Sequence, residues 1–259
     1  MLSAAEIAQY HEQGYVFPDF KLPAETLQQI RDDHTALLAK HPEFRDNCPD
    51  LLSFDLGFLE YARNPAILDM VAQLIGPDIA LWNMSFFAKP AVNGKKTPWH
   101  QDGAYWPIRP LATCTVWIAI DDATPENGCM RFIPGSHKAK RLADHAVNND
   151  PNYTLNQELT AGAFDEADAV DVALEAGQIS LHDVYLYHGS EVNVSRHPRR
   201  GMTLRLMPTS SHYDRALASQ FHREKGGYDQ SVRSLFLLRG ADTAGLNDFQ
   251  VQSAAAHRG

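Results

Sequence analysis

The sequence lacks the features that mark several classes of protein. It contains only three cysteines, Cys48, Cys114 and Cys129, and no C-x-x-C spacing. Such a sparse, odd-numbered set argues against a disulfide framework and against a zinc finger, and it favours a reducing, cytoplasmic compartment. No apolar run approaches the roughly 18 residues that a membrane-spanning helix requires, so we expect no membrane partner.

Blocks of basic residues are also missing, and the formal net charge is −9 at pH 7. A nucleic-acid-binding surface needs clustered lysine and arginine, so we expect no nucleic-acid partner. The opening stretch MLSAAEIAQYHEQGY has neither the basic nor the apolar segment of a signal peptide, and none is expected. Nothing in the sequence indicates an oligomeric state.

The first part of the chain carries helix signals. Ser3 and Glu6 have the spacing of a capping box, and Gly14 follows as a stop. Residues 23–40 repeat apolar side chains at helical spacing, and residues 64–76 begin with Asn-Pro and end with glycine. We therefore expect a mainly helical layer over residues 1–78.

From residue 79 onward the apolar pattern changes to short runs rich in β-branched and aromatic residues, which predict strands. These runs cover residues 79–89, 113–120, 129–134, 178–183, 184–189 and 201–207. Residues 140–171 are polar and acidic and are expected to form a long insertion between strands. Helices followed by many short strands predict a mainly β protein with packed helices (α+β), an antiparallel sandwich or barrel. We expect one domain over residues 1–259, with its β core at 79–208 and a tail or lid at 209–259.

The stretch WHQDGAYW, residues 99–106, holds an imidazole and a carboxylate two positions apart, His100 and Asp102. Side chains at i and i+2 of a strand point to the same face, so both donors can be aimed at one point. Two histidines and one carboxylate are the usual ligands of iron(II) with open coordination positions. An H-x-D pair is common by chance, so a third ligand decides whether this is a metal site.

Three of the twelve histidines are candidates for that third ligand. His188 ends the apolar run VYLYHG and is followed by the small residues Gly189 and Ser190, which leave room near a metal. His182 lies on the preceding predicted strand, and His137 lies in the stretch PGSHK. Spacing alone leaves the choice open, because each could also be a core histidine with a backbone partner.

Several ordered motifs resemble the phytanoyl-CoA dioxygenase family of iron(II)/2-oxoglutarate oxygenases. They are WHQDGAYWPIRP, TVWIAIDDATPENGCMRFIPGSHK and HGSEVNVSRHPRRGMTLRL, and the similarity extends over roughly residues 5–210. The resemblance implies a double-stranded β-helix, also called a jelly roll or cupin barrel. It implies that His100, Asp102 and His188 hold iron(II), and that 2-oxoglutarate and O2 are cosubstrates.

The implied reaction converts 2-oxoglutarate to succinate and CO2 and hydroxylates an unactivated C–H bond of a small molecule. Halogenating relatives replace the carboxylate ligand by a small residue, whereas Asp102 is present here, so we expect hydroxylation and not chlorination. No general acid or base beyond the metal centre is expected.

The resemblance also implies an arginine that anchors 2-oxoglutarate, and Arg199 occupies that position, eleven residues after His188. A guanidinium offers a carboxylate two parallel donors, which lysine cannot. Arg200 is the alternative if the alignment slips by one residue. On a strand, Arg199 would share a face with Gly201, Thr203 and Arg205. Further expected contacts with the cosubstrate are Trp117, Ser190 and Lys89, although Trp117 could be core and Lys89 structural.

The substrate is less defined. Candidate contacts are Trp99, Tyr105, Trp106, Tyr185 and Arg109. The aromatic rings could hold an ammonium by cation–π attraction or could form a dry apolar pocket. The basic residues Lys95, Lys96, Arg109, Arg131 and His137 could meet a carboxylate, phosphonate or phosphate, or could simply be solvated.

A small polar metabolite bearing an amine or phosphonate is the favoured substrate; an acyl-CoA or a natural-product intermediate is the alternative. Two other functions compete with an oxygenase. A cupin-type isomerase or hydrolase could use zinc or manganese in the same ligands without needing Arg199. A non-catalytic small-ligand binder would be expected to have lost a ligand or the arginine.

Overall fold

The computed structural model describes residues 1–226 and 228–251, without the side chains of Tyr105 and Lys225. The helices are α1 (Ala4–Gln13), α2 (Ala24–Lys40), α3 (Leu59–Ala62), α4 (Pro65–Ile75) and α5 (Arg215–Lys225). The strands are β1 (Tyr15–Val16), β2 (Asn47–Cys48), β3 (Ile79–Lys89), β4 (Thr97–His100), β5 (Ile108–Arg109), β6 (Cys114–Ala119), β7 (Met130–Phe132), β8 (His145–Val147), β9 (Gln157–Leu159), β10 (Val170–Val172), β11 (Ile179–Asp183), β12 (His188–Ser190), β13 (Arg199–Pro208), β14 (His212–Tyr213) and β15 (Phe236–Arg239).

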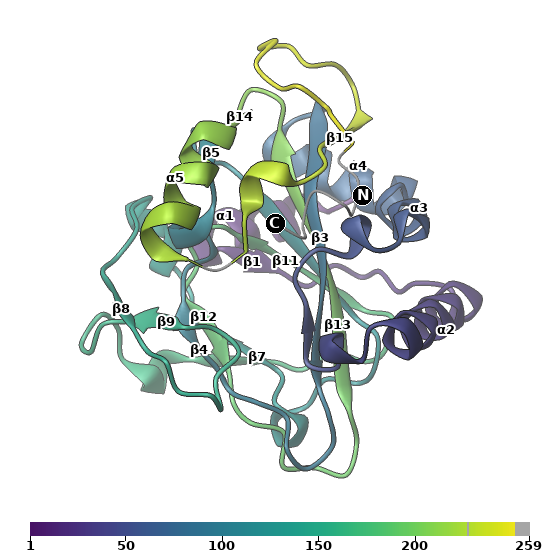
Figure 1. The fold of residues 1–259 in the computed structure, drawn as a ribbon, viewed down its shortest axis with the longest axis vertical. Helices are drawn as coiled ribbons and strands as arrows, with labels where there is room; N and C mark the ends of the chain where they lie inside the picture. The colour runs from purple at the N-terminus through teal and green to yellow at the C-terminus, as the bar shows by residue number, and fades with distance from the viewer. Residues whose placement is uncertain (227, 252–259) are drawn as a thin grey trace.

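Two antiparallel sheets form the centre of the protein. The larger has the strand order β1-β11-β6-β13-β3-β15, with β2 also paired to β3, and the smaller has the order β10-β7-β12-β4. Figure 1 shows the long strands β3 and β13 beside α2, with β4, β7 and β12 on the other side of them. The expected mainly β fold with packed helices is confirmed.

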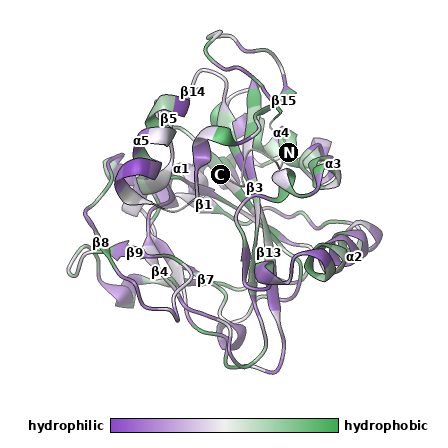
Figure 2. Ribbon diagram, viewed as in Figure 1, coloured by the Kyte–Doolittle hydropathy of each residue, from purple (hydrophilic) through white to green (hydrophobic). Residues whose placement is uncertain are grey.

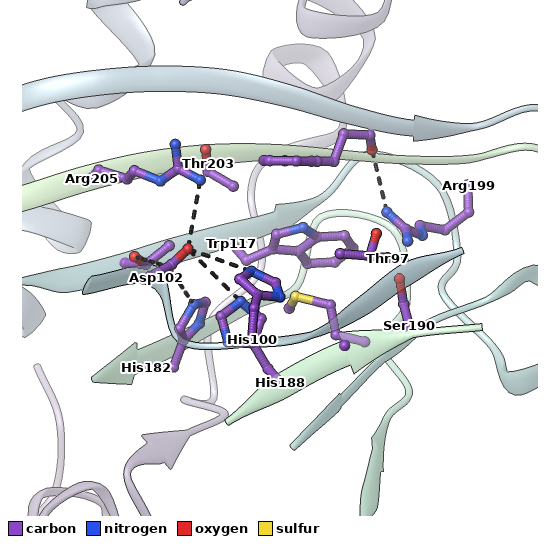
Figure 3. Close-up of a pocket in the computed structure, with 14 residues that line it drawn as sticks. Thr97, His100, Asp102, Trp117, His182, His188, Ser190, Arg199, Thr203 and Arg205 are labelled. Atoms are coloured by element: carbon purple, nitrogen blue, oxygen red, sulfur yellow. Dashed lines mark hydrogen bonds and ion pairs between the residues drawn. The ribbon is translucent and has the colours of Figure 1, made fainter. Parts of the chain in front are cut away.

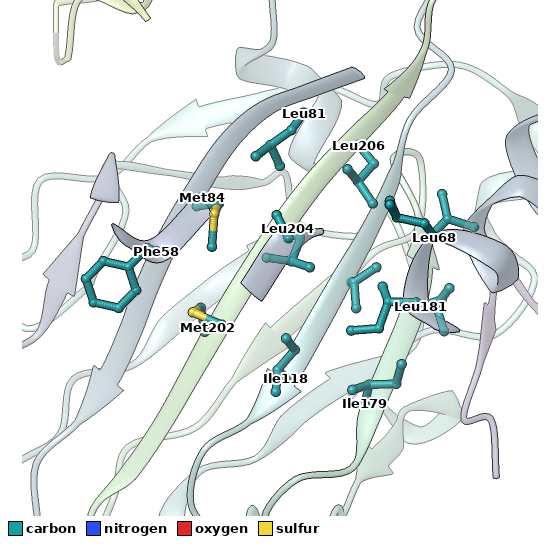
Figure 4. Packing of buried hydrophobic residues seen from close by; sticks show 14 of the residues in the cluster. Phe58, Leu68, Leu81, Met84, Ile118, Ile179, Leu181, Met202, Leu204 and Leu206 are labelled. Carbon is teal, nitrogen blue, oxygen red and sulfur yellow. The ribbon is translucent and has the colours of Figure 1, made fainter. Parts of the chain in front are cut away.

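The main hydrophobic core lies between the helices and one face of the larger sheet. Leu27 and Ile30 of α2 and Ile67 and Val71 of α4 are buried in the same cluster as the strand residues. Figure 4 shows Met84, Ile118, Leu181, Met202 and Leu204 gathered on this face. The outer side of α2 is hydrophilic (Figure 2), as an amphipathic surface helix requires.

Several local expectations are confirmed. Ser3 and Glu6 form the capping box of α1, and Gly14 ends the helix in the left-handed conformation. Asn64 caps α4 by accepting hydrogen bonds from the backbone N–H groups of Ala66 and Ile67. The strand expected over residues 79–89 has those bounds.

The strand expected over residues 184–189 is wrong. Val184 and Tyr185 form a turn instead, and residues 186–187 are irregular, because Asp183 accepts hydrogen bonds from the backbone N–H groups of Tyr185 and Leu186. The strand begins at His188 and runs to Ser190. A short side chain that binds its own backbone overrides the β propensity of the residues that follow it.

The expected insertion and tail both contribute strands. The hairpin of β8 and β9 lies inside residues 140–171, and β10 at its end pairs with β7. In the tail, β15 pairs with β3 and lies at the edge of the larger sheet, so residues 236–239 belong to that sheet. Within the described residues, no helix combines the length and apolar character needed to cross a bilayer.

Candidate metal centre

The two strands β4 and β12 bring His100 and His188 together. The two residues are direct partners in the antiparallel register, and their ring centroids lie 4.1 Å apart. Asp102 is not in the strand, as its spacing suggested, but at the start of a 3-10 helix over Asp102–Tyr105. Gln101 keeps an extended backbone, so the side chains of His100 and Asp102 still converge.

Donor atoms of His100, Asp102 and His188 all lie within 4.8 Å of one another, and all three residues are buried. Oδ1 of Asp102 is 3.7 Å from Nε2 of His100 and 3.9 Å from Nε2 of His188. Two ligand atoms that are each about 2.1 Å from an ion are at most about 4.2 Å apart, so both separations fit a shared ion. Figure 3 shows the three side chains pointing toward one another.

Backbone carbonyls fix the orientation of both histidine rings. Nδ1 of His100 lies 2.8 Å from the carbonyl oxygen of Pro98, and Nδ1 of His188 lies 3.1 Å from that of Leu186. Each Nδ1 therefore carries the proton and donates it, which leaves the Nε2 lone pair free. This is the arrangement found for histidines that bind metals.

The surroundings favour the protonation states that metal binding requires. Burial would raise the pKa of Asp102, but the neighbouring imidazoles of His100 and His182 and the nearby charge of Arg205 hold it well below its usual value. Burial and the neighbouring His100 hold the pKa of His188 well below its usual value. At neutral pH the group is thus a carboxylate with a neutral imidazole.

His182, the rival third ligand, lies on the far side of the carboxylate. Its Nε2 is 3.7 Å from Oδ2 of Asp102, and its Nδ1 has no hydrogen-bond partner among the described residues. The same oxygen accepts a hydrogen bond from Oγ1 of Thr115 at 3.4 Å. His137 is remote from this group, with its Nε2 against the carbonyl oxygen of His11.

Arg199 is buried in the wall of the same pocket. Its Nε and Nη2 donate to the carbonyl oxygen of Gly128, and its Nη1 donates to that of Phe87. Burial lowers the pKa of Arg199 to about 10, so it stays charged at neutral pH. No carboxylate of the described residues forms an ion pair with it. A buried guanidinium with only neutral acceptors is a site for an anion.

Trp117 lies against Arg199, whose guanidinium carbon is 5.6 Å from the indole ring. The indole packs directly on the backbone of Gly201, where an added Cβ would lie 2.1 Å from its Cζ2 atom. Thr97, Met130, Ser190 and Thr203 also line this pocket. The structure therefore brings together Arg199, Trp117 and Ser190.

Arg200 and Lys89 lie outside this pocket. Arg200 points to the other face of β13 and binds both carboxylate oxygens of Asp121 at 2.8 Å. Nζ of Lys89 donates to the carbonyl oxygens of Lys95 and Glu191, which do not line the pocket. Burial lowers the pKa of Lys89 to about 6. Lys89 thus ties backbone segments together and has no access to a cosubstrate in the pocket.

A second cavity, of about 130 Å³, opens on the other side of His100 and Asp102. Trp106 lines it, together with Arg205 and two residues of the tail, Gln230 and Arg233. Trp106 is the one expected substrate contact that lies here among the described side chains.

The other expected substrate contacts face elsewhere. Trp99 points to the opposite side of β4, against Phe164 and beneath Arg131. Tyr185 lies in a separate surface pocket under Lys140, and Arg109 is exposed. The side chain of Tyr105 is outside the described part of the structure. Of the basic residues, Lys96 pairs with Glu191, and Arg131 pairs with Glu166 and Asp171.

The sequence interpretation missed the roles of Arg205 and Thr115 in lining or contacting this centre. The alternation along β13 placed Arg205 on the face of Arg199, which is a usable signal. Arg233 is one of the polar tail residues that the sequence suggests as part of a lid over the substrate, but no local pattern shows that it reaches the cavity beside His100.

Both histidines lie on the smaller of the two antiparallel sheets, and with Asp102 they form a buried group of two histidines and one carboxylate. Such a group on such a fold is typical of the class of mononuclear non-haem metal proteins with a double-stranded β-helix. The family model for phytanoyl-CoA dioxygenase (PhyH) matches residues 2–201. The chain belongs to this family.

Individual relatives agree with the family assignment. A phytanoyl-CoA dioxygenase domain-containing protein 1 homolog of Caenorhabditis briggsae is 33% identical over 130 residues, which cover 48% of this chain and 45% of that protein. A probable alpha-ketoglutarate-dependent hypophosphite dioxygenase of Stutzerimonas stutzeri is 31% identical over 140 residues, which cover 53% and 48%. The chain thus spans about half the length of the curated relatives it matches.

A solved structure of a non-heme monooxygenase, ThoJ in its apo form, is similar to almost the whole chain. The TM-score is 0.75 at 27% identity, and the match covers 96% of this chain and 89% of that one. The expected double-stranded β-helix is confirmed by this similarity and by the two-sheet topology.

Proposed function

We propose that this protein is an iron(II)- and 2-oxoglutarate-dependent oxygenase that hydroxylates an unactivated C–H bond of a small polar molecule. The observation that carries the proposal is the pairing of two features in one pocket. A buried group of His100, Asp102 and His188 lies beside a buried arginine, Arg199, that has no carboxylate partner among the described residues.

His100, Asp102 and His188 fit iron(II) in donor type, protonation state and ring orientation. When bound, the iron with 2-oxoglutarate and O2 supplies the oxidant for the C–H bond, and 2-oxoglutarate is released as succinate and CO2. The Stutzerimonas relative, named as alpha-ketoglutarate-dependent, supports this choice of cosubstrate. The protein's part is to hold the groups in place and to exclude water.

Arg199 binds the distal carboxylate of 2-oxoglutarate in this proposal. Two of its nitrogens share the single carbonyl oxygen of Gly128, so the guanidinium is oriented but not neutralised. Trp117 and Ser190 complete the same wall. Arg200 is already paired with Asp121 and does not compete for this role.

The substrate enters the second cavity, beside His100, Asp102 and Trp106. At about 130 Å³ this cavity is similar in size to an engineered cavity of roughly 150 Å³ that binds benzene. A small polar metabolite fits such a space better than an acyl-CoA. Asp102 fills the ligand position that a halide would need, so we expect hydroxylated and no chlorinated product.

Anaerobic titration of the metal-free protein with iron(II) and 2-oxoglutarate tests the proposal. We expect the visible charge-transfer band that 2-oxoglutarate gives when it chelates iron(II). The band should be lost in His188→Ala and should need much more 2-oxoglutarate in Arg199→Ala. With O2, the wild-type protein should release succinate.

The absence of a band from folded, metal-loaded protein would overturn the proposal. Zinc or manganese retained after anaerobic purification, again without a band, would instead favour an isomerase or hydrolase. Metal-free protein that binds a small ligand and releases no succinate would favour the binding function.

A further inference from the structure

Two largely buried arginines face the second cavity from different parts of the chain. Arg205 lies on β13, and Arg233 follows the short 3-10 helix over Gln230–Val232. Arg233 is 5% exposed, and both residues line the cavity that reaches His100 and Asp102. Figure 3 shows Arg205 directly beside Asp102.

Neutral groups hold both guanidinium groups in position. Nη1 of Arg205 donates to the side-chain oxygen of Asn83 at 2.8 Å, and Nη1 of Arg233 donates to the carbonyl oxygen of Pro49 at 3.1 Å. Each guanidinium carbon lies 5.9 Å from the ring of Trp82. Aromatic faces and neutral oxygens orient a cation without cancelling its charge.

The nearby carboxylates do not balance this charge once the metal centre is formed. Asp102 is 3.9 Å from Nη2 of Arg205, but in the proposed function its charge is shared with the iron. Asp50 is 3.9 Å from Nη1 of Arg233 and also accepts hydrogen bonds from Ser53 and Tyr228. Two buried cations therefore share one remaining carboxylate.

Unused donors remain on both arginines. The Nε atoms of Arg205 and Arg233 are buried, and neither has a hydrogen-bond partner in the described part of the chain. A guanidinium is charged at neutral pH, and an excess buried positive charge is costly unless an anion joins it.

We propose that Arg205 and Arg233 bind the acidic group of the substrate, which is a small organic anion bearing a carboxylate or phosphonate. This inference rests on the proposed function, because the oxidised C–H bond must face the centre formed by His100 and Asp102. An amine in an aromatic cage is disfavoured, because the ring of Trp106 already carries the guanidinium of Arg205, 5.1 Å from its centroid.

Small probe anions test the charge preference without knowledge of the natural substrate. The protein is loaded with iron(II) and saturating 2-oxoglutarate without O2, so that the Arg199 site is filled. Propionate, ethylphosphonate, propionamide and propylammonium are then titrated, and tryptophan fluorescence is followed because Trp82 and Trp106 contact the arginines. We expect saturable binding of the two anions at millimolar concentration and no binding of the amide or ammonium.

Variants locate the binding site. Arg233→Gln should weaken the binding of the anions about tenfold or more, the usual effect of losing a charged hydrogen bond. Arg233→Lys should weaken it less. Arg239→Gln is the matched control, because Arg239 lies in the same tail segment but pairs with Asp69 at the surface. Circular dichroism checks that each variant is folded.

Equal or tighter binding of the amide or ammonium would overturn the proposal, as would failure of both anions to bind to the wild-type protein. Unchanged anion binding in folded Arg233→Gln would also overturn it. The charge-transfer band reports the binding of 2-oxoglutarate to iron and not the binding of an anion in the second cavity. It therefore distinguishes failure of this inference from failure of the proposed function. If the wild-type protein gives no band, the proposed function is wrong, whether or not the anions bind.

Discussion

His100 and His188 are direct cross-strand partners, and each ring is held by the carbonyl oxygen of the residue two positions before it. The antiparallel register of β4 and β12 thus presents two Nε2 atoms to the same carboxylate, Asp102. Strand pairing therefore positions two of the three proposed metal ligands.

Removing one of these ligands should abolish the stabilisation that iron(II) provides. Iron(II) added without O2 should raise Tm of the wild-type protein by several degrees, because a ligand at about 100 times its Kd contributes about 2.7 kcal/mol. A chelator should reverse the shift. We expect no shift for His188→Ala in a thermal melt.

His137→Ala is the control for that experiment, since His137 is buried away from the centre. It should keep the full metal-induced shift. If His188→Ala kept the shift and His182→Ala lost it, His182 and not His188 would be the third ligand.

The two adjacent arginines should respond differently to the same substitution. Arg199→Lys should weaken 2-oxoglutarate binding by about tenfold to a hundredfold, because lysine cannot make the bidentate contact. Arg200→Lys should change it by no more than about twofold, since Arg200 faces away from the pocket and pairs with the half-buried Asp121. Titration with 2-oxoglutarate, followed by the charge-transfer band, measures the affinity of both variants. Equal losses of affinity in the two variants would contradict the assignment of Arg199.

Gly201 should not tolerate a side chain. An added Cβ would meet the indole of Trp117, and overpacking of this kind costs about 1–3 kcal/mol. Gly201→Ala should therefore lower the free energy of unfolding in urea and, by displacing Trp117 from Arg199, weaken 2-oxoglutarate binding. The double variant Gly201→Ala/Trp117→Leu should recover stability relative to Trp117→Leu alone; additive losses would show that the two residues are not coupled.

His34 should make the protein sensitive to acid. Its ring is buried in α2 against Phe86, and burial lowers its pKa to about 4. The unfolded chain binds a proton at about pH 6.5, whereas the folded protein does not until about pH 4, so the free energy of unfolding falls as the pH falls through this window. The contribution of His34 is about 2 kcal/mol between about pH 7 and about pH 5.

Urea unfolding at both pH values measures this contribution. In His34→Phe, which cannot titrate, the loss of stability on acidification should be smaller than in the wild-type protein by that amount. An equal loss in both proteins would mean that other groups carry the acid sensitivity.

Local signals in the sequence were reliable where neighbouring residues decide the structure. The capping box of Ser3 and Glu6 and the Asn64 cap act within a few residues, and both formed as expected. The alternation along β13 also holds, with Arg199, Thr203 and Arg205 facing the pocket and Met202 and Leu204 in the core. The strand expected over residues 184–189 failed because Asp183 stabilises a turn that no hydrophobic period reveals.

The sequence by itself determined the positions of α1, α2 and α4, the mainly β class and the H-x-D pair, because propensity, capping and period-two patterning depend on nearby residues. Only the tertiary structure decided which histidine lies opposite His100, that Trp99 and Tyr185 face away from the centre, and that Arg233 reaches the second cavity. These relationships depend on strand register and on the packing of the tail, which join residues far apart in the chain.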